Sequence, residues 1–284
     1  MNKQLLLFII GIGLSGGVSA QPFYTKADSI CVTKLLAEAR SLPPSTNMPL
    51  HFARKFIGIP YVAHTLEVCD PERLVVNTRQ LDCTTLVETV VALTLCAGSK
   101  QYSWSDFLDA LTRLRYRDGR LDDYTSRLHY FTDWIVDNTS KGVVREVQQQ
   151  SAPFTAVQTI CTGYMSAHPD AYRALKAHPQ MVAVIRKQEE RLNGLKFRYI
   201  PKREIRNTEG LRKAVSDGDI IAITCSKTGL DIAHLGFAVW RNDGLHLLNA
   251  SQLHKKVVEE PMPLGEYLSR HPSHTGIRII RMNK

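Results

Sequence analysis

The sequence predicts an α+β fold in which a central helix packs on an antiparallel sheet, with extra helices on its N-terminal side. Apolar residues recur at helical spacing through most of the chain up to about residue 195. From about Phe197 onward, short runs of β-branched residues separated by turn residues replace this spacing. Helices followed by strands are typical of α+β folds. The apolar segment 83–98 supplies the central helix.

The helical part of the chain begins with two segments, 27–39 and 48–56, before the central helix. The central segment has Asp82 as an N-cap, Gly98 as a C-terminal stop, and neither Pro nor Gly between them. Because apolar residues cover most of its circumference, we expect this helix to be buried. Further helices are expected over residues 103–114, 124–138 and 181–195.

The strand-rich part predicts strands over residues 219–224, 232–240, 245–249 and 277–280. Turn residues separate these strands at Gly229, at 242–244 and at 261–263. No internal repeat and no clear linker divides the chain, so we expect residues 21–284 to form a single domain with a helical N-terminal part.

Residues 1–20 have the pattern of a secretory signal peptide. Lys3 gives a positive start, Leu5 to Leu14 an apolar stretch, and Val18-Ser19-Ala20 a cleavage site of small residues. The apolar stretch is too short to span a bilayer. We therefore expect an exported protein, either periplasmic or secreted.

The chain carries a formal net charge of +9, with its Lys and Arg residues scattered along the sequence. A basic exported protein can meet anionic polymers such as cell-wall glycopeptide or nucleic acid, and a soluble, mildly basic surface is the alternative. The sequence contains no motif for binding DNA or RNA and, after the signal, no stretch that could span a membrane. Neither nucleic acid nor a membrane is expected as a partner.

Six cysteines lie after the signal, and none has the CxxC or Cys/His spacing of a zinc site, so no metal is expected. Cys83 falls in the first turn of the central helix. The helix dipole and the unpaired N–H groups there favour a thiolate and predict a lowered pKa, which suits a nucleophile. A buried, inert cysteine is the alternative.

His234 is the candidate base for such a nucleophile, because it interrupts an otherwise almost apolar strand. Alternation places His234 on the same face as Gly236 and Ala238, which leave room there for a helix end to approach. The alternative is a core histidine with satisfied hydrogen bonds.

Asn249 is the candidate third residue that orients the imidazole. A hairpin loop with an even number of residues around 242–244 would put Asn249 on the face of His234. The register that sets Asn249 opposite Gly236 leaves it diagonal to His234 and within reach. A loop with an odd number of residues would put Asn249 on the opposite face. A turn centred on Asp243-Gly244 would leave Asn249 too far from His234.

Five segments in this order resemble the motifs of the NlpC/P60 cysteine hydrolases of bacterial peptidoglycan. They are Gly58-Ile59-Pro60-Tyr61-Val62, Leu81-Asp82-Cys83-Thr84-Thr85-Leu86, Gly218-Asp219-Ile220-Ile221, Ile232-Ala233-His234-Leu235-Gly236 and Leu248-Asn249-Ala250-Ser251. With segments 62–67 and 126–131, the chain is most similar to the DUF1460 branch, described as N-acetylmuramoyl-L-alanine amidase-like. The resemblance implies a papain-like fold.

The resemblance also implies roles for individual residues. Cys83 corresponds to the nucleophile, His234 to the base and Asn249 to the orienting residue. Tyr61 corresponds to a tyrosine that lines the substrate site, and Asp82 and Thr84 to the residues that flank the cysteine, although Thr84-Thr85 stand where the family commonly has Ser-Gly. A packed aromatic residue is the alternative for Tyr61 and a plain helix cap for Asp82. Arginines 117, 120 and 127, together with Tyr124 and Tyr130, are further candidates for contacts with peptide carboxylates and sugar. A solvated basic face is the alternative for each of these arginines.

The resemblance implies a hydrolase that cleaves the amide between N-acetylmuramic acid and L-Ala in peptidoglycan fragments (muropeptides) through a thioester. It implies no metal and no organic cofactor. Two alternatives stay open: cleavage of the bond from D-Glu to diaminopimelate, and a wall-binding protein without activity.

Overall fold

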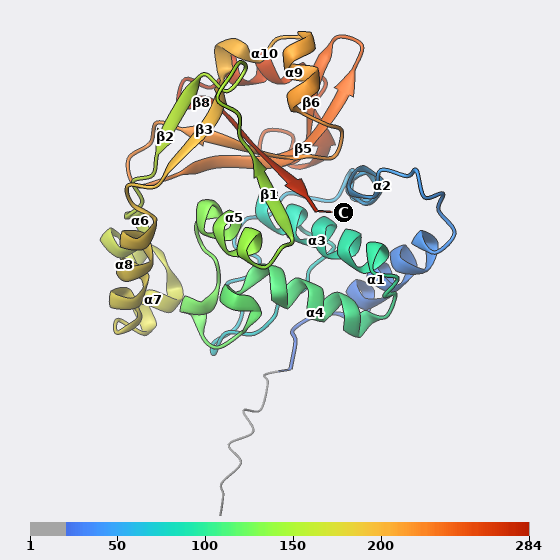
Figure 1. The fold of residues 1–284 in the computed structure, drawn as a ribbon. Coiled ribbons are helices and arrows are strands. Elements are labelled where there is room, and N and C mark those ends of the chain that lie inside the picture. Colours follow the sequence, from blue (N-terminus) through green and yellow to red (C-terminus); the bar gives the residue numbers. More distant parts are fainter. Residues whose placement is uncertain (1–20, 284) are drawn as a thin grey trace, which may run out of the picture.

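The protein is an antiparallel sheet covered by helices, in a computed structural model that describes residues 21–283 (Figure 1). The expected signal peptide, residues 1–20, lies outside the described residues. Within residues 21–283, no helix is long and apolar enough to cross a membrane.

The first half of the described chain is helical, as the spacing of its apolar residues predicts. Helices α2, α3 and α4 each begin at a side chain that accepts a backbone N–H bond from the first turn, which satisfies an otherwise unpaired donor. These side chains belong to Asn47, Asp82 and Ser103. The helices are α1 (Lys26–Ala39), α2 (Met48–Lys55), α3 (Cys83–Gly98), α4 (Trp104–Arg115) and α5 (Phe131–Ser140).

The helix expected over 124–138 is wrong in its first half. Thr125 bonds back to the Asp123 carboxylate in a short 3-10 turn, and the chain then runs extended. Arg127 forms an antiparallel bridge with Tyr116, and the Leu128 N–H donates to the Arg115 carbonyl oxygen. The backbone groups of this stretch are therefore paired outside a helix, and α5 begins only at Phe131.

The second half contributes most of the sheet, whose strands run in the order β2-β3-β8-β4-β5-β6-β7, with β1 paired to β8. Every pairing is antiparallel, which confirms the expected sheet type. The strands are β1 (Val144–Val147), β2 (Ala156–Thr159), β3 (Lys196–Pro201), β4 (Ile220–Cys225), β5 (Ile232–Arg241), β6 (Gly244–Ser251), β7 (Lys256–Glu259) and β8 (His274–Met282). Strands β1 and β2 lie before Phe197, where the sequence predicted the strand-rich part to begin.

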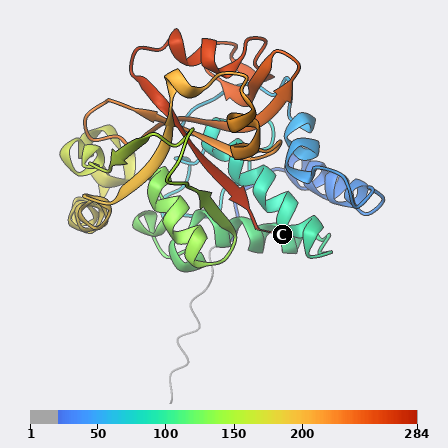
Figure 2. The same ribbon diagram turned by 45° about the horizontal axis from the view of Figure 1, so that its top comes forward.

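The two faces of the sheet belong to different hydrophobic clusters. Helices α1 to α5 share one cluster with Leu235, Phe237 and Val239 of β5. The opposite cluster joins Ala238 to α9 (Glu209–Ala214) and α10 (Leu264–Ser269). Figures 1 and 2 show α9 and α10 on the side of the sheet away from α3.

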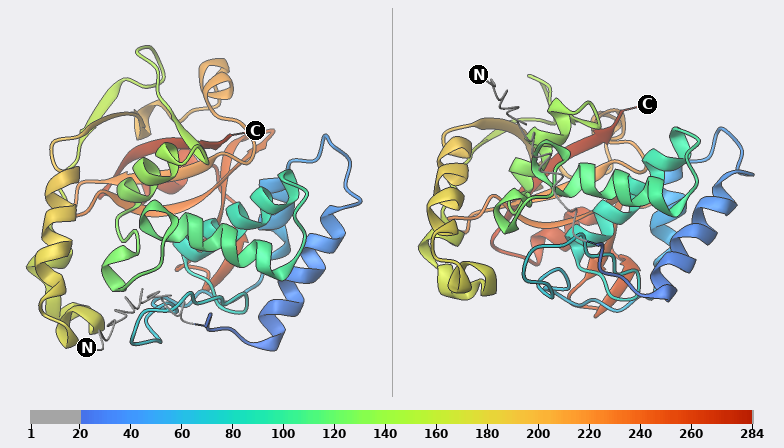
Figure 3. Two further views of the ribbon diagram at one scale, coloured as in Figure 1. Left: turned by 60° about the horizontal axis from the view of Figure 1, so that its bottom comes forward. Right: turned by 90° about the horizontal axis from the view of Figure 1, so that it is seen from below.

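A third group of helices stands beside these layers. It contains α6 (Tyr164–Ala167), α7 (Arg173–Ala177) and α8 (Met181–Leu192), which share a cluster with Tyr124 and Tyr130. Figure 3 shows these helices at one side of the molecule, next to the segment that precedes α5.

The expectation that α3 approaches the face of Gly236 and Ala238 is wrong. The helix packs on the opposite, odd-numbered residues of β5. The space around Gly236 is taken by the neighbouring strand, since a Cβ added there would lie 2.6 Å from the Leu248 carbonyl oxygen and 2.7 Å from Leu247 Cδ1. The small residue therefore serves close packing of β5 against β6.

We predict that Gly236→Ala destabilises the protein by about 1–3 kcal/mol, because the added methyl group overlaps a backbone oxygen that the sheet holds in place. The free energy of unfolding in urea would measure this. Gly210→Ala is the matched control, because nothing lies within 4 Å of its added Cβ and Ala favours a helix. Equal stability of the Gly236→Ala variant and the wild type would contradict this packing.

Candidate active site

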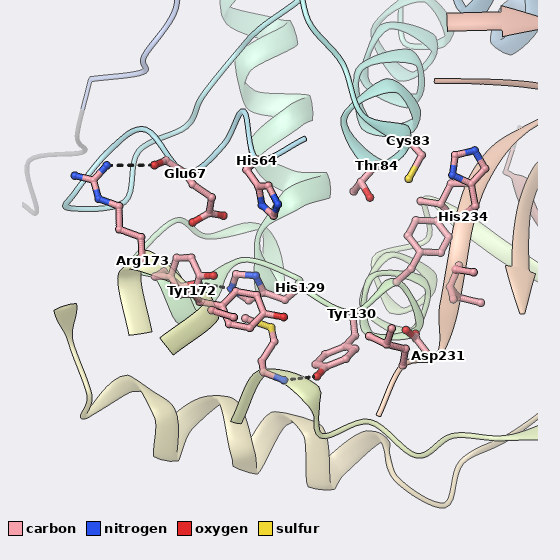
Figure 4. Close-up of a pocket in the computed structure, with 18 residues that line it drawn as sticks. His64, Glu67, Cys83, Thr84, His129, Tyr130, Tyr172, Arg173, Asp231 and His234 are labelled. Carbon is pink, nitrogen blue, oxygen red and sulfur yellow. Dashed lines mark hydrogen bonds between the residues drawn. The ribbon is translucent and has the colours of Figure 1, made fainter. Parts of the chain in front are cut away.

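Cys83 occupies the first position of α3 and lines a cavity of about 230 Å³. The thiol is partly buried. Thr84 and His234 line the same cavity, and Figure 4 shows all three at one end of it. Cys83 packs against the hydrophobic cluster that contains Leu235 of β5, the residue directly after His234. The two residues expected to form a nucleophile and base are thus brought to one place.

His234 is held by a hydrogen bond across the hairpin. Phe237 pairs with Leu248 and Arg241 with Gly244, so the loop between β5 and β6 contains two residues. This register places Asn249 opposite Gly236 and diagonal to His234, which is the register that brings the two side chains within reach. His234 Nε2 lies 2.9 Å from Asn249 Oδ1.

This contact decides which imidazole nitrogen carries the proton. Asn249 Oδ1 can only accept a hydrogen bond, so Nε2 of His234 must donate. A neutral imidazole then keeps its lone pair on Nδ1. Nδ1 is therefore the nitrogen free to take a proton from a nearby thiol.

Burial controls the protonation of both groups. It lowers the pKa of His234 below its usual range, although the hydrogen bond that His234 donates to Asn249 and the Glu260 carboxylate act in the opposite direction. Burial and the Asp82 carboxylate raise the pKa of the Cys83 thiol to about 12. At neutral pH the resting site therefore holds a neutral imidazole and a protonated thiol.

The prediction of a lowered pKa for Cys83 is accordingly wrong for the resting site. The loss of water around the sulfur and the negative charge of Asp82 outweigh the hydrogen bonds to the thiolate from Leu235 and Thr84. A thiol in this position needs a base to become a nucleophile.

The three residues expected to contact a ligand lie in different surroundings. Thr84 lines the cavity. The Asp82 carboxylate accepts hydrogen bonds from the backbone N–H and the hydroxyl group of Thr85, at 2.8 Å each, so it caps α3. Tyr61 does not line the cavity, but its backbone forms a parallel bridge with Leu81, two residues before Cys83.

The other cavity walls come mainly from segments 62–67 and 126–131, which the family resemblance includes, and from the α6–α8 group, which sequence reasoning did not connect with the site. His64 and Glu67 come from the loop after α2, His129 and Tyr130 from the stretch before α5, and Tyr172 from the α6–α8 group (Figure 4). His64 has a positive φ of 61°, which is uncommon for a residue with a Cβ. Burial lowers the pKa of His129 to about 3, so its imidazole is neutral.

Two of the arginines expected to meet substrate carboxylates are already paired within the protein. Arg127 is buried and lies 2.9 Å from Glu67 and 3.2 Å from Glu72. Arg117 pairs with Asp133. Their role in the structure is to hold the loops that carry cavity residues, while Tyr124 and Tyr130 line the cavity as expected.

Comparisons with known proteins agree on one family. Residues 51–277 match the family model AmiA-like, described as N-acetylmuramoyl-L-alanine amidase-like. A comparison with curated proteins finds no match.

Solved structures give the same result. The crystal structure of an N-acetylmuramoyl-L-alanine amidase from Bacteroides uniformis is 43% identical, covering 84% of this chain and 98% of that one with a TM-score of 0.78. A Bacteroides fragilis structure named provisionally as a xylanase is 41% identical, covering 82% and 100%, with a TM-score of 0.76. A Legionella pneumophila protein described as DUF1460 shares the fold at 22% identity, covering 90% and 94%, with a TM-score of 0.70.

We predict that Asp82→Asn lowers the pKa of the Cys83 thiol, because the variant removes a negative charge beside the sulfur. Asparagine keeps an oxygen for the Thr85 N–H, so stability should change by less than about 0.5 kcal/mol. The rate of Cys83 alkylation by iodoacetamide, followed by peptide mass spectrometry across pH, should show its midpoint at lower pH than in the wild type.

Asp106→Asn is the control for this measurement. Asp106 also lies in the first turn of a capped helix, but that helix is α4 and the residue is absent from the groups that shift the Cys83 pKa. A midpoint that stays in place in Asp82→Asn, or moves equally in both variants, would contradict the assignment.

Proposed function

Because the chain belongs to the AmiA-like family of N-acetylmuramoyl-L-alanine amidase-like proteins, we propose that it is a cell-wall amidase that uses Cys83 as a nucleophile. The proposed reaction is hydrolysis of the amide bond between N-acetylmuramic acid and L-Ala in peptidoglycan fragments. The contact between His234 Nε2 and Asn249 Oδ1 carries this proposal, because it directs the basic Nδ1 atom away from Asn249 and leaves it for a thiol. In this proposal, the arrangement is that of the NlpC/P60 enzymes and their papain-like fold.

The first half of the reaction forms a thioester. His234 Nδ1 takes the Cys83 proton as the sulfur attacks the lactyl carbonyl carbon of the muramoyl group. The backbone N–H of Cys83, at the first helical position, has no partner within the helix and is available to stabilise the oxyanion. The His234 imidazolium then donates its proton to the nitrogen of L-Ala, the C–N bond breaks, and the stem peptide leaves.

The second half restores the enzyme. Water enters the site vacated by the peptide amine and gives a proton to His234 Nδ1 as its oxygen attacks the thioester carbon. The C–S bond breaks, the sulfur regains a proton from the imidazolium, and the muramic acid carboxylate is released. The high pKa of the thiol and the low pKa of the imidazole both disfavour a thiolate–imidazolium pair in the resting site. The proton is therefore transferred as the sulfur attacks.

The cavity beside Cys83 is the proposed substrate site. Thr84 and the aromatic residues Tyr124, Tyr130 and Tyr172 line it, which suits the apolar face of a sugar ring flanked by polar groups. In this proposal, Tyr61 and Asp82 act from the other side of the sulfur. The protein acts on muropeptides in the periplasm or outside the cell, after removal of residues 1–20.

Two other reactions would use the same cavity differently. An endopeptidase of the NlpC/P60 type would cut between D-Glu and diaminopimelate with the same Cys83 and His234. A wall-binding protein would have no use for an imidazole whose free nitrogen is set up as a base. We therefore favour catalysis, and the family description favours the amidase bond.

A xylanase activity, named for one related structure, would need two carboxyl groups on either side of a glycosidic bond. Two carboxylates, Glu67 and Asp231, line the cavity. Glu67 pairs with Arg127 at 2.9 Å, and Asp231 Oδ2 accepts the backbone N–H of Thr132 at 2.6 Å. Both are committed to holding the fold, which argues against their service as a general acid and a nucleophile.

We predict that wild-type protein incubated with purified muropeptides releases a free stem peptide and a free muramic-acid saccharide, detected by mass spectrometry. Cys83→Ala should reduce this rate at least about 10⁴-fold, because the nucleophile is removed. Cys161→Ala is the matched control, since Cys161 is exposed and does not line the cavity, and it should keep wild-type activity.

The products distinguish the alternatives. Cleavage after D-Glu would keep Cys83 as nucleophile but assign the protein to the endopeptidases. Cleavage of xylan oligosaccharides, or residual amidase activity in Cys83→Ala equal to that of the wild type, would contradict the proposal.

A further inference from the structure

We propose that Glu260 is a positioning residue that sets the orientation of the Asn249 amide and, through it, the protonated nitrogen of His234. This inference rests on the proposed function, in which His234 is the base for Cys83. Sequence reasoning did not single out Glu260, which follows β7 directly.

The contacts form a chain of buried polar groups behind His234. Asn249 is fully buried, and its Nδ2 donates to Glu260 Oε1 at 3.0 Å. Glu260 is itself only 1% exposed. Its second oxygen, Oε2, lies 3.1 Å from Nε2 of His254, whose side chain reaches solvent. Every side chain from the imidazole to the surface is therefore in contact with the next.

The carboxylate fixes which way the Asn249 amide points. An ionised carboxylate only accepts hydrogen bonds, so the amide group facing Glu260 must be the NH₂ donor. The amide oxygen is then left to face His234, which in turn must present Nε2–H. Among residues 21–283, the other acceptor near the NH₂ group is the Leu247 carbonyl oxygen, 3.5 Å from Nδ2. Without Glu260, this weaker contact alone would orient the amide.

A reversed amide would disable the proposed base. With Nδ2 facing the imidazole, His234 would have to accept at Nε2 and carry its proton on Nδ1. That tautomer offers Cys83 a donor where the reaction needs an acceptor. The proposed role of Glu260 is to exclude this arrangement.

The backbone keeps the carboxylate in place. The Glu260 N–H donates to the Leu247 carbonyl oxygen at 2.8 Å, and the Glu260 carbonyl oxygen lies 2.9 Å from Nδ1 of His246. His246 is fully buried. Glu260 is therefore fixed to β6, the strand that carries Asn249, and the distance between the two side chains does not depend on a flexible loop.

Glu260 also supplies charge to the site. Its carboxylate favours the imidazolium form of His234, which appears when the thiol is deprotonated. Other titratable groups lie around the imidazole and Glu260, at the start of α3 and in the α10–β8 region. They include Asp82, Cys83, Tyr267, His271 and His274.

The test is the alkylation of Cys83 by iodoacetamide as a function of pH, read from the peptide that contains it, in wild type and Glu260→Gln. Glutamine has nearly the same shape but can donate toward Asn249, so it permits the reversed amide. We expect alkylation at pH 7 to fall at least about tenfold, the size of effect that outer hydrogen-bond partners commonly have. At high pH, where the thiol ionises without a base, the two rates should converge.

Asp219→Asn is the matched control, because Asp219 is a similarly buried carboxylate, directly before β4, and is paired with Arg281. It should leave the alkylation profile of Cys83 unchanged. A profile for Glu260→Gln within twofold of wild type, or an equal fall in Asp219→Asn, would overturn the positioning role.

A second measurement begins with the wild-type protein, where no variant has to fold. ¹⁵N chemical shifts of the imidazole nitrogens in wild-type protein at neutral pH should show His234 protonated at Nε2. A dominant Nδ1–H form would overturn the inference. In Glu260→Gln, the Nδ1–H fraction should rise.

These readouts separate the inference from the proposed function. If wild-type protein cleaves no muropeptide but Glu260→Gln still changes the alkylation profile and the tautomer, the amidase proposal fails and the role of Glu260 stands. If His234→Ala alkylates like the wild type, His234 is not the base for Cys83 and the inference is overturned with it.

Discussion

The packing of helix α3 on strands β5 and β6 is the contact on which the candidate site depends. Leu86, Val87, Val90 and Val91 of α3 are fully buried and share one cluster with Phe237 and Leu248 of the two strands. Because these side chains interlock, the helix cannot slide along the sheet without opening cavities. The Asp82 cap fixes where the helix starts, so its first residue, Cys83, is held beside His234.

The same packing creates the electrostatic problem that the site has to solve. Removing water from around Cys83 and His234 stabilises the neutral form of each group. Polar groups then have to be supplied by the protein itself, in fixed positions. Asn249 and Glu260 supply them behind His234, in a chain of contacts that extends from the imidazole into the sheet. In the resting site Cys83 and His234 are therefore neutral, and the fixed polar groups can stabilise a thiolate and an imidazolium when these form during a reaction.

Local patterns were sufficient to predict the parts of this site that lie on regular elements. The α3 boundaries follow from the Asp82 cap and the uninterrupted apolar run. Strand alternation with an even hairpin loop predicts that His234 and Asn249 share a face, and the register that brings them into contact comes from the structure. The family description and the structures of relatives agree with the amidase-like resemblance that these motifs carry. The catalytic roles of Cys83, His234 and Asn249 are the part that we propose.

Features that depend on tertiary contacts could not be read from the sequence. The stretch 127–130 has helical spacing but is extended, because Arg127 is drawn into a buried ion pair with Glu72. Alternation identifies the two faces of β5 but not which one meets α3. The pKa of Cys83 depends on how much water the fold excludes, and Glu260 is eleven residues from Asn249 in a segment without a distinguishing pattern.

The central claim is that the Cys83 sulfur forms a covalent bond to the acyl group of its substrate. The most direct measurement is the intact mass of wild-type protein quenched in acid during turnover of a muropeptide, followed by mapping of the modified residue. We expect an adduct on Cys83 with the mass of the muramoyl saccharide, because the sugar carries the carbonyl group in an amidase reaction. Steady release of products with no adduct on Cys83, or an adduct on another residue, would contradict it.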